Sequence, residues 1–212
     1  MSNSRGRLIL IEGLDRTGKT TQCTLINKNL NFDYYKFPNR ETPIGKIINE
    51  YLTQNMKLCD QSIHLLFSSN RWELQNEIKT KLDAGIDCIL DRYVYSGLAY
   101  SAAKNIKGMD LDWCLQPDIG LLKPDLTIFL TNDSFNNNEG FGEEIYENTK
   151  FQNDVKNIFV NKIFTTNFEN VDYLNEHFKN INVTGLNIEE VNKVIVDIID
   201  NFKIANDEYL YF

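Results

Sequence analysis

Short apolar runs recur along the chain and predict the strands of a buried sheet. A strand covered on both faces is apolar throughout, whereas a strand with one face in water alternates. Runs of the first kind, some with one polar residue, lie at residues 8–11, 34–37, 86–90, 126–130 and 181–183. The last run is the weakest. Pro38 follows the second run and would end that strand, because proline has no N–H to donate to a neighbouring strand.

Between these runs, apolar residues return every three or four positions, which is the period of a helix with one buried face. This spacing predicts a helix that ends near residue 30, a helix with Pro43 in its first turn, and helices at 60–83, 96–104, 110–116, 145–164 and 188–202. Residues 165–179 carry no clear pattern and predict no element.

The order of these elements predicts a single α/β domain over residues 1–212. Strands and helices alternate without a repeat or a linker, which is typical of a parallel sheet flanked by helices. A chain of 212 residues is long enough for one such domain with a sizeable core. Residues 131–143 are rich in asparagine and glycine, and this composition predicts a mobile loop after the fourth strand.

The strongest chemical signal is a segment that fits the pattern G-x-x-x-x-G-K-[ST] and lies between a predicted strand and a predicted helix. It reads Gly13-Leu14-Asp15-Arg16-Thr17-Gly18-Lys19-Thr20. The glycines let the backbone curl so that its N–H groups converge on a phosphate, and the helix N-terminus adds partial positive charge. In such a loop Lys19 reaches the outer phosphates and the Thr20 hydroxyl binds Mg²⁺. The strand–loop–helix order disfavours the alternative of a chance glycine-rich turn.

Two residues inside this loop are unusual. Asp15 places a carboxylate beside a phosphate cradle, which is unfavourable unless the carboxylate binds something other than phosphate. Arg16 places a guanidinium within reach of a γ-phosphate, where charge changes during phosphoryl transfer. The alternative is that both are solvated loop charges.

Charge is distributed unevenly along the chain. The net charge is −8 and the isoelectric point is near 4.9, which disfavours nucleic acid as a partner. All six arginines lie within the first 92 residues, so positive charge can still gather around a phosphate-bearing substrate. Arg71 falls within the apolar stripe of the helix at 60–83, where its guanidinium must pair with a carboxylate or line a cavity.

The four cysteines form no C-x-x-C pair, so we expect free thiols in a reducing compartment and no zinc site. No apolar stretch is long enough to span a membrane, and the N-terminus has neither a signal-peptide core nor a myristoylation signal. We therefore expect no membrane partner and a location in the cytoplasm, the nucleus or both.

Several stretches of the chain together resemble the thymidylate kinase family, and most closely its eukaryotic, fungal-type members. They are residues 8–22, 37–40, 49–53, 64–73, 91–97, 120–126 and 140–147. The resemblance extends over residues 7–152 and is loose in the C-terminal third. It implies a P-loop NTPase-type fold, that of a nucleoside monophosphate kinase, with a five-stranded parallel sheet and a mobile lid over ATP at about 131–147.

The resemblance also implies an activity and its ligands. The enzyme would transfer the γ-phosphoryl group of ATP to dTMP and give dTDP for dTTP synthesis. ATP would be the co-substrate and Mg²⁺ the cofactor. The family forms homodimers, so the resemblance implies a homodimer here as well.

Matching positions imply the site residues. The catalytic set would be Arg16, Lys19, Asp15 and Arg92. The ATP phosphates would be bound by Gly13, Leu14, Asp15, Arg16, Thr17, Gly18, Lys19, Thr20 and Thr21. dTMP would be bound by Asp15, Phe37, Arg40, Phe67, Arg71, Arg92, Ser96, Gly97, Tyr100, Tyr146 and Gln152. Mg²⁺ would be held by Thr20 and Asp91, partly through water.

Within this set, the resemblance implies a separate role for each part of dTMP. Asp15 would accept a hydrogen bond from the sugar 3′-hydroxyl, and Arg40 and Arg92 would hold the 5′-phosphate. Phe67 would stack on the thymine ring, and Arg71 would bond to its edge.

One position departs from the family pattern, because many relatives have arginine where this chain has Ile145. No lysine or arginine occurs between Pro124 and Thr149, so the lid has no cation to offer. We therefore expect Arg16 to provide the positive charge on the migrating phosphoryl group.

Two other readings of the residues stay open. A deoxynucleoside kinase or another nucleoside monophosphate kinase would share the fold, although a nucleoside substrate would not need Arg40. A non-catalytic nucleotide-binding switch of the GTPase type would need an Asn-Lys-x-Asp motif. The segment Asn161-Lys162-Ile163-Phe164 lacks its aspartate.

Overall fold

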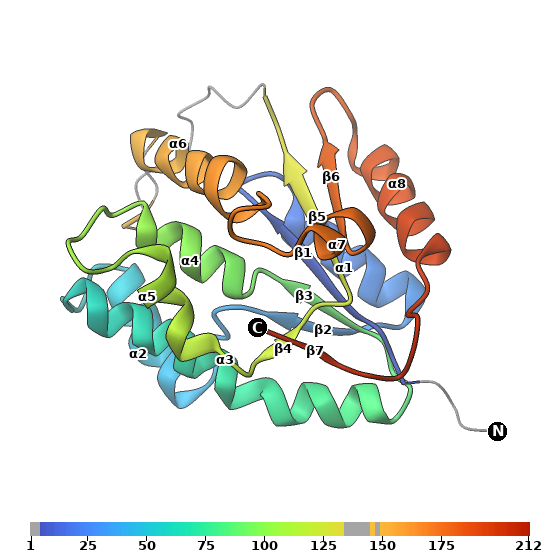
Figure 1. The fold of residues 1–212 in the computed structure, drawn as a ribbon, viewed down its shortest axis with the longest axis horizontal. Helices are drawn as coiled ribbons and strands as arrows, with labels where there is room; N and C mark the ends of the chain where they lie inside the picture. The colour runs from blue at the N-terminus through green and yellow to red at the C-terminus, as the bar shows by residue number, and fades with distance from the viewer. Residues whose placement is uncertain (1–4, 134–144, 147–148) are drawn as a thin grey trace.

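The predicted apolar runs form one parallel sheet of five strands (Figure 1). The computed structural model describes residues 5–133, 145–146 and 149–212. The strand order across the sheet is β2-β3-β1-β5-β6, and every neighbouring pair runs parallel. The strands are β1 (Leu8–Gly13), β2 (Asp33–Lys36), β3 (Cys88–Asp91), β5 (Leu126–Thr131) and β6 (Phe178–Asn182). The α/β fold with a five-stranded parallel sheet is thus confirmed.

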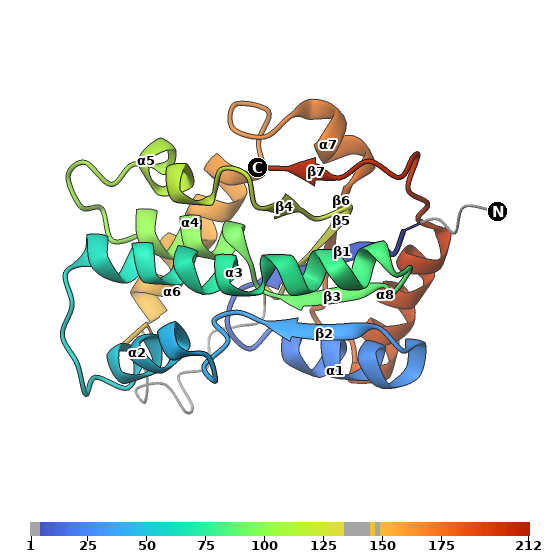
Figure 2. The ribbon, with the colours of Figure 1, turned by 90° about the horizontal axis from the view of Figure 1, so that it is seen from below.

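Strand β1 shows why helices cover both faces of the sheet. Leu8 and Leu10 point to one face, Ile9 and Ile11 point to the other, and all four side chains are buried. The first face is covered by α3 (Asp60–Asp83), α4 (Val94–Ala102) and α6 (Thr149–Ile158). The second face is covered by α1 (Lys19–Leu30) and α8 (Ile188–Asn201) (Figures 1 and 2).

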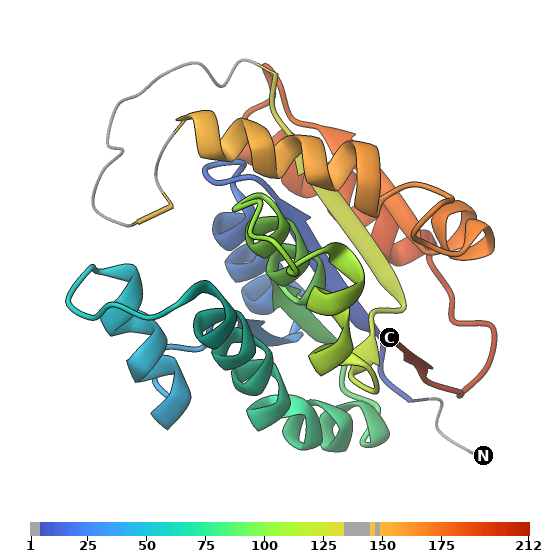
Figure 3. The ribbon, with the colours of Figure 1, turned by 60° about the vertical axis from the view of Figure 1, so that its left-hand side comes forward.

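A smaller apolar cluster lies away from the sheet, where α2 (Pro43–Leu52) packs against the N-terminal part of α3 (Figure 3). Its buried members are Ile48, Tyr51, Leu52 and Ile63. The short helix α5 (Leu111–Leu115) and the 3-10 turn η1 (Gln116–Asp118) follow α4 and return the chain to α3. Helix α3 is therefore contacted by several segments, and it forms one wall of the site described below.

The helix expected from Ile145 in fact begins at Thr149. Ile145 and Tyr146 form a turn instead, and the Ile145 N–H donates to the Leu52 carbonyl oxygen at 3.2 Å. At its other end this helix continues as a π-helical turn, η2 (Phe159–Ile163). The apolar period does not distinguish an α-helical from a π-helical turn, so the sequence predicted one continuous helix.

The unpatterned residues 165–179 contain the six-residue helix α7 (Val171–Glu176) and the start of β6. β6 begins at Phe178, before the predicted start at residue 181. It is the edge strand beside β5 and is only partly buried, so its first residues lack the continuous apolar character of a central strand. β3 and α4 are also displaced by two residues at their starts relative to the predicted ranges 86–90 and 96–104.

A second, two-stranded sheet was not predicted. β4 (Leu122–Lys123) pairs in antiparallel register with β7 (Leu210–Tyr211) in the C-terminal tail. The tail leaves α8 and runs back beside β4 (Figure 1), where the ring of Phe212 lies 5.2 Å from that of Tyr95. Strands of two residues are too short to give an apolar pattern, which is why the sequence did not reveal them.

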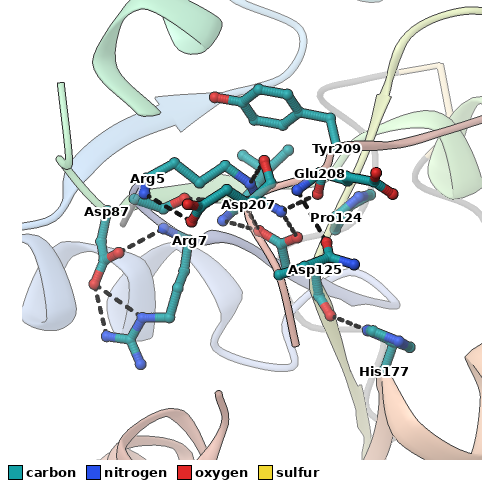
Figure 4. A network of polar contacts seen from close by, with 12 residues as sticks. Arg5, Arg7, Asp87, Pro124, Asp125, His177, Asp207, Glu208 and Tyr209 are labelled. Carbon is teal, nitrogen blue, oxygen red and sulfur yellow. Dashed lines mark hydrogen bonds and ion pairs between the residues drawn. The ribbon is translucent and has the colours of Figure 1, made fainter. Parts of the chain in front are cut away.

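Arg5 joins the two ends of the chain (Figure 4). Its guanidinium forms a buried bidentate ion pair with Asp125 at 2.7 and 2.8 Å. It also donates to the carbonyl oxygens of Asp207 at 3.1 Å and Glu208 at 2.7 Å. Arg7 lies in the same network, so both arginines stand before β1 at the end of the sheet away from the phosphate loop.

None of the helices in the described part of the chain is long and apolar enough to cross a bilayer. Most of the lid expected at about 131–147 lies outside the described residues. Only its ends, at 131–133 and 145–146, belong to the described structure.

Candidate active site

A cavity of about 410 Å³ lies at the carboxyl edge of the sheet, beyond the ends of β1 and β3. Ligands of parallel α/β sheets bind at this edge. The cavity is lined by Asp15, Arg16, Gly18, Lys19, Thr20, Thr21, Lys36, Pro38, Arg40, Leu52, Phe67, Arg71, Arg92, Tyr93, Ser96, Gly97, Tyr100, Ser101 and Tyr146.

The loop after β1 needs both of its glycines. Gly13 has φ 147°, and a Cβ there would lie 2.5 Å from the Leu130 carbonyl oxygen, so a side chain cannot be accommodated. Gly18 has φ 86° and directly precedes α1, whose first N–H groups have no partner within the helix. These N–H groups and the positive end of the α1 dipole form an anion site beside the exposed Arg16.

The side chain of Lys19 is buried beside this loop, and its Nζ donates a hydrogen bond to the Leu14 carbonyl oxygen. Burial and the nearby positive charge of Arg92 lower the pKa of Lys19 to about 7, against the opposing effect of nearby carboxylates. The charge of this lysine therefore changes near neutral pH.

Asp91, at the end of β3, has one carboxylate oxygen in hydrogen bonds and one without a partner. Oδ2 accepts from the Thr20 hydroxyl at 2.5 Å and from the Tyr34 hydroxyl at 3.2 Å. Oδ1 is buried and has no hydrogen-bond partner among the described residues. A buried, unsatisfied carboxylate oxygen is unfavourable unless it binds a cation or a water. Together with the Thr20 hydroxyl it offers the hard oxygen ligands that Mg²⁺ prefers.

Asp15 is the centre of a polar network that spans the cavity. Its carboxylate pairs with the Arg92 guanidinium and accepts from the Tyr100 hydroxyl at 3.2 Å and from Gln152 Nε2 at 2.7 Å. Burial alone would raise the pKa of Asp15. The charges of Arg92 and Lys19 and the two neutral donors outweigh it and lower that pKa. The carboxylate therefore stays ionised despite its position in a phosphate loop.

Glu12 holds the start of α4 in place from below the cavity. It is fully buried, and its carboxylate accepts from the Tyr93 N–H at 3.0 Å, the Ser96 N–H at 2.9 Å and the Ser96 hydroxyl at 2.6 Å. Arg92 immediately before has φ 66°, a left-handed conformation that is uncommon outside glycine. These bonds fix the backbone directly after Arg92 and so fix where the Arg92 side chain begins.

Arg71 is buried and forms a bidentate ion pair with Asp118. Nε donates to Oδ1 at 3.1 Å and Nη2 donates to Oδ2 at 2.6 Å, and Asp118 is itself fully buried. A Cβ at Gly97 would lie 2.9 Å from both Nη1 and Nη2, so a residue without a side chain is required against the guanidinium. Both readings left open by the sequence are therefore correct, because Arg71 pairs with a carboxylate and also lines the cavity.

A polar stripe on α3 attaches the segment that carries Asp118. The Pro117 carbonyl oxygen accepts from the Ser68 hydroxyl at 2.9 Å and from Trp72 Nε1 at 2.7 Å. One turn later, Gln75 donates to the Gly120 carbonyl oxygen at 3.0 Å. Residues 68, 72 and 75 follow helical spacing, so one face of α3 binds this segment along its length.

The remaining ligand-type residues come from α3, the segment before α2 and the turn before α6. Phe67 lies one turn before Arg71 on α3, so its half-buried ring and the guanidinium share one face of the cavity. Arg40 donates from Nη1 to Asn49 Oδ1 on α2 at 3.0 Å. Tyr146 stacks on Phe151, with ring centroids 5.4 Å apart and an interplanar angle of 17°.

Most of the sequence-predicted residues meet at this cavity. Six of them do not line it. Gly13, Leu14 and Thr17 are buried within the phosphate loop. Asp91 lies beneath Thr20, Gln152 lies against Asp15, and the buried ring of Phe37 packs 5.2 Å from that of Tyr93. Phe37 therefore supports the wall and does not form it, and the cavity is lined by the adjacent Pro38 instead.

Sequence reasoning missed several residues of the site. Lining residues without a predicted role are Lys36, Pro38, Leu52, Tyr93 and Ser101, and supporting residues without one are Glu12, His64 and Asp118. Ser101 was accessible to prediction, since it follows Tyr100 on the predicted helix. The supporting residues were not, because each acts through a partner far away in sequence.

Comparison with known proteins gives one consistent result. The family model described as thymidylate kinase matches residues 11–195. The thymidylate kinase of Schizosaccharomyces pombe is 42% identical over 208 residues, which are 95% of this chain and 95% of that protein. The thymidylate kinase of Danio rerio is 41% identical over 210 residues, covering 95% of this chain and 93% of that protein.

Comparison with solved structures also finds thymidylate kinases. The thymidylate kinase of Candida albicans, described as having broad substrate specificity, matches with a TM-score of 0.86 and 42% identity over 99% of both chains. The thymidylate kinase of Ehrlichia chaffeensis matches with a TM-score of 0.66 and 22% identity over 92% of this chain and 98% of that one, a likeness of fold alone.

Proposed function

Because this chain belongs to the thymidylate kinase family and so transfers the γ-phosphoryl group of ATP to dTMP, giving dTDP for dTTP synthesis, we propose that the cavity at the carboxyl edge of the sheet is its active site. One observation supports this most. The phosphate loop, the Asp15–Arg92 pair and the Phe67–Arg71 face all line the same cavity of about 410 Å³. Phosphate, sugar and base groups can therefore be contacted at once.

The phosphates of ATP bind the loop of residues 13–21 and the N-terminus of α1 in this proposal. Gly13 and Gly18 provide the backbone conformation, and Lys19 exchanges its hydrogen bond to the Leu14 carbonyl oxygen for one to a phosphate oxygen. Arg16 is exposed at the cavity wall and contacts the γ-phosphoryl group as it migrates. This contact strengthens as charge moves, which is what lowers the barrier.

dTMP binds the opposite wall. Phe67 stacks on the base, and Arg71, held by Asp118, donates to the O4 edge. Arg40 and Arg92 bind the 5′-phosphate. Gly97 leaves room beside the guanidinium of Arg71, and the other predicted contacts are Ser96, Tyr100, Tyr146 and Gln152.

Asp15 binds the sugar 3′-hydroxyl in this proposal. Its ionised carboxylate accepts hydrogen bonds only, and it accepts from Tyr100 and Gln152. The ion pair with Arg92 keeps the acceptor-binding arginine close to the position it needs when dTMP arrives. Such positioning supplies much of the rate enhancement in phosphoryl transfer.

Mg²⁺ fits the donor set formed by Asp91 and Thr20. Asp91 and Thr20 would hold the ion, and the unsatisfied Oδ1 of Asp91 supports this assignment, since it would accept a hydrogen bond from a water on Mg²⁺. When bound, Mg²⁺ neutralises charge on the β- and γ-phosphates.

We also propose a homodimer formed through α3. Leu65, Trp72 and the neighbouring Ile119 are large apolar side chains with 44%, 40% and 49% of their surface exposed, and such exposure is common at protein interfaces. We further propose a location in the cytoplasm or nucleus, which the four free cysteines support.

A coupled assay of ADP release over dTMP, dUMP, dCMP, dGMP and thymidine tests the proposed site. dTMP is expected to have the highest kcat/KM, and thymidine is expected to be a poor substrate because it lacks the phosphate that Arg40 and Arg92 bind. Arg40→Ala should raise the KM for dTMP and leave ATP binding unchanged. Equal turnover of thymidine and dTMP would instead indicate a nucleoside kinase.

A further inference from the structure

Two polar residues at the back of the cavity have no role in phosphoryl transfer. His64 on α3 is fully buried, and Ser101 on α4 is 5% exposed and lines the cavity. His64 Nδ1 lies 2.7 Å from Ser101 Oγ, and His64 Nε2 lies 2.9 Å from the Cys114 carbonyl oxygen. The imidazole thus bridges the cavity wall and the end of α5.

The partner of Nε2 determines where the proton of His64 resides. A carbonyl oxygen only accepts hydrogen bonds, so Nε2 must carry the proton. The charged groups that act on the ring are Arg71, Asp118 and Lys104, and the ring of Trp113 packs 5.3 Å away. Burial and the positive charge of Arg71 lower the pKa of His64, so the imidazole is neutral at pH 7.

A neutral imidazole protonated at Nε2 has a lone pair on Nδ1. Ser101 must therefore donate its hydroxyl proton to His64 Nδ1. A serine hydroxyl has one proton and two lone pairs, so Ser101 can offer the cavity only a hydrogen-bond acceptor.

Arg71, by contrast, offers the cavity only hydrogen-bond donors. Asp118 occupies its Nε and one side of Nη2, which leaves the remaining N–H groups as donors at the cavity wall. Arg71 therefore presents donors at the wall and Ser101 presents an acceptor. Thymine and uracil have the complementary O4 acceptor and N3–H donor, whereas cytosine has an amino donor and an N3 acceptor.

We propose that His64 is a positioning residue for base selection, because it holds the Ser101 proton and makes Ser101 an acceptor for the N3–H of a thymine or uracil base, directly or through one water. The inference rests on the proposed function. It explains how the same site would discriminate against cytosine. A purely structural His64 would tie α3 to α4 and α5 without any effect on which base is chosen.

The test is a double-mutant cycle of His64→Phe and Ser101→Ala, read as the ratio of kcat/KM for dTMP to that for dCMP. His64→Phe frees the Ser101 hydroxyl to turn its proton toward cytosine N3, so the ratio should fall by about tenfold, or 1.4 kcal/mol. Ser101→Ala should also lower the ratio, and adding His64→Phe to it should change the ratio no further. His64→Gln, whose amide offers both an acceptor and a donor, should keep most of the discrimination.

His177→Phe is the matched control. One ring nitrogen of His177 also lies 2.7 Å from a carbonyl oxygen, that of Asp125, in the network at the other end of the sheet (Figure 4). This variant reports the general cost of losing a histidine bridge and should leave the ratio unchanged.

The outcomes are distinguishable. Wild-type activity on dTMP with an unchanged ratio in His64→Phe would overturn the inference alone, and so would an equal drop in the Ser101→Ala background. If His64→Phe does not fold, an unchanged ratio in Ser101→Ala overturns it. A wild-type protein that does not phosphorylate dTMP would overturn the proposed function itself, and the inference with it.

Discussion

Asp15 places a negative charge in a loop built to bind phosphates, and its neighbours accommodate that charge. Arg92 pairs with the carboxylate, while Tyr100 and Gln152 donate hydrogen bonds to it. The carboxylate thereby stays ionised, so it can bind a neutral donor such as a sugar hydroxyl and repels a misplaced phosphate. One residue can thus help to separate the two phosphate-bearing substrates within one cavity.

Arg16→Gly is expected to lower kcat by about 10³-fold or more, because an arginine on the migrating phosphoryl group is worth roughly 10³–10⁵ in rate in phosphate-loop enzymes. The KM for dTMP should change little, since the contact strengthens only as charge migrates. Steady-state kinetics at saturating ATP measures both parameters.

Two further variants control this prediction. Arg16→Lys keeps the charge without the planar fork and should retain part of the rate. Ile145→Arg in the Arg16→Gly background should restore part of it, because residue 145 lies at the described end of the expected lid. Near-normal kcat in Arg16→Gly would show that another residue carries the role.

ATP binding is expected to depend on pH through Lys19. Its pKa of about 7 in the ligand-free protein means that it is charged below pH 7 and largely neutral above it. Bound phosphates favour the charged form, so at pH 8 the protein should take up close to one proton per ATP, and affinity should fall as pH rises through 7. Titration calorimetry in two buffers of different ionisation enthalpy measures the uptake.

Lys19→Arg is the control for the proton uptake, because an arginine stays charged at all these pH values. The same titrations at pH 6 should show little uptake with the wild type. Uptake that is equal at pH 6 and pH 8 would contradict the assignment to Lys19.

Helix α3 combines two functions along one element. Its apolar positions pack on the sheet, while Ser68, Trp72 and Gln75 bind the segment that follows α5. This attachment brings Asp118 to Arg71, so the orientation of the Arg71 guanidinium depends on how two elements pack. If Arg71 reads the base as proposed, base selection depends on the packing of α3 against η1 and not on Arg71 alone.

Asp118→Ala is expected to lower the free energy of unfolding by about 3–5 kcal/mol, because removing one partner of a buried ion pair leaves the other charge uncompensated. It should also raise the KM for dTMP by more than it lowers kcat. Urea denaturation followed by fluorescence measures the first effect. Asp197→Ala on the exposed face of α8 should change stability by less than about 0.5 kcal/mol, and a similar loss in both variants would contradict the explanation.

Over the whole chain, the sequence predicted features formed by neighbouring residues and missed contacts between residues that are far apart in sequence. The phosphate loop was readable because its glycines, lysine and threonine lie within eight consecutive residues. The strands and long helices were readable from their apolar periods. The Arg71–Asp118 pair was not, because its members are 47 residues apart and meet only through tertiary packing. The β4–β7 sheet was missed because its strands are only two residues long.

Phe212→Ala tests how far the C-terminal tail supports the molecule. The Phe212 ring packs 6.2 Å from that of Tyr93 and 5.2 Å from that of Tyr95. Its loss should lower the free energy of unfolding by about 1–3 kcal/mol, the range for an apolar side chain of this size. Thermal and urea denaturation measure the change. Tyr211→Ala is the control, since that side chain is 50% exposed and should contribute less than about 0.5 kcal/mol.

The bond between the first described residue and the last few has a consequence for biosynthesis. Two of the acceptors of Arg5, the carbonyl oxygens of Asp207 and Glu208, are made 202 and 203 residues after it. At about 5–20 residues per second, Arg5 waits roughly 10–40 s for them. The network in Figure 4 therefore closes only once residues 207 and 208 have been made, and a chain cut before them retains the phosphate loop without this closure.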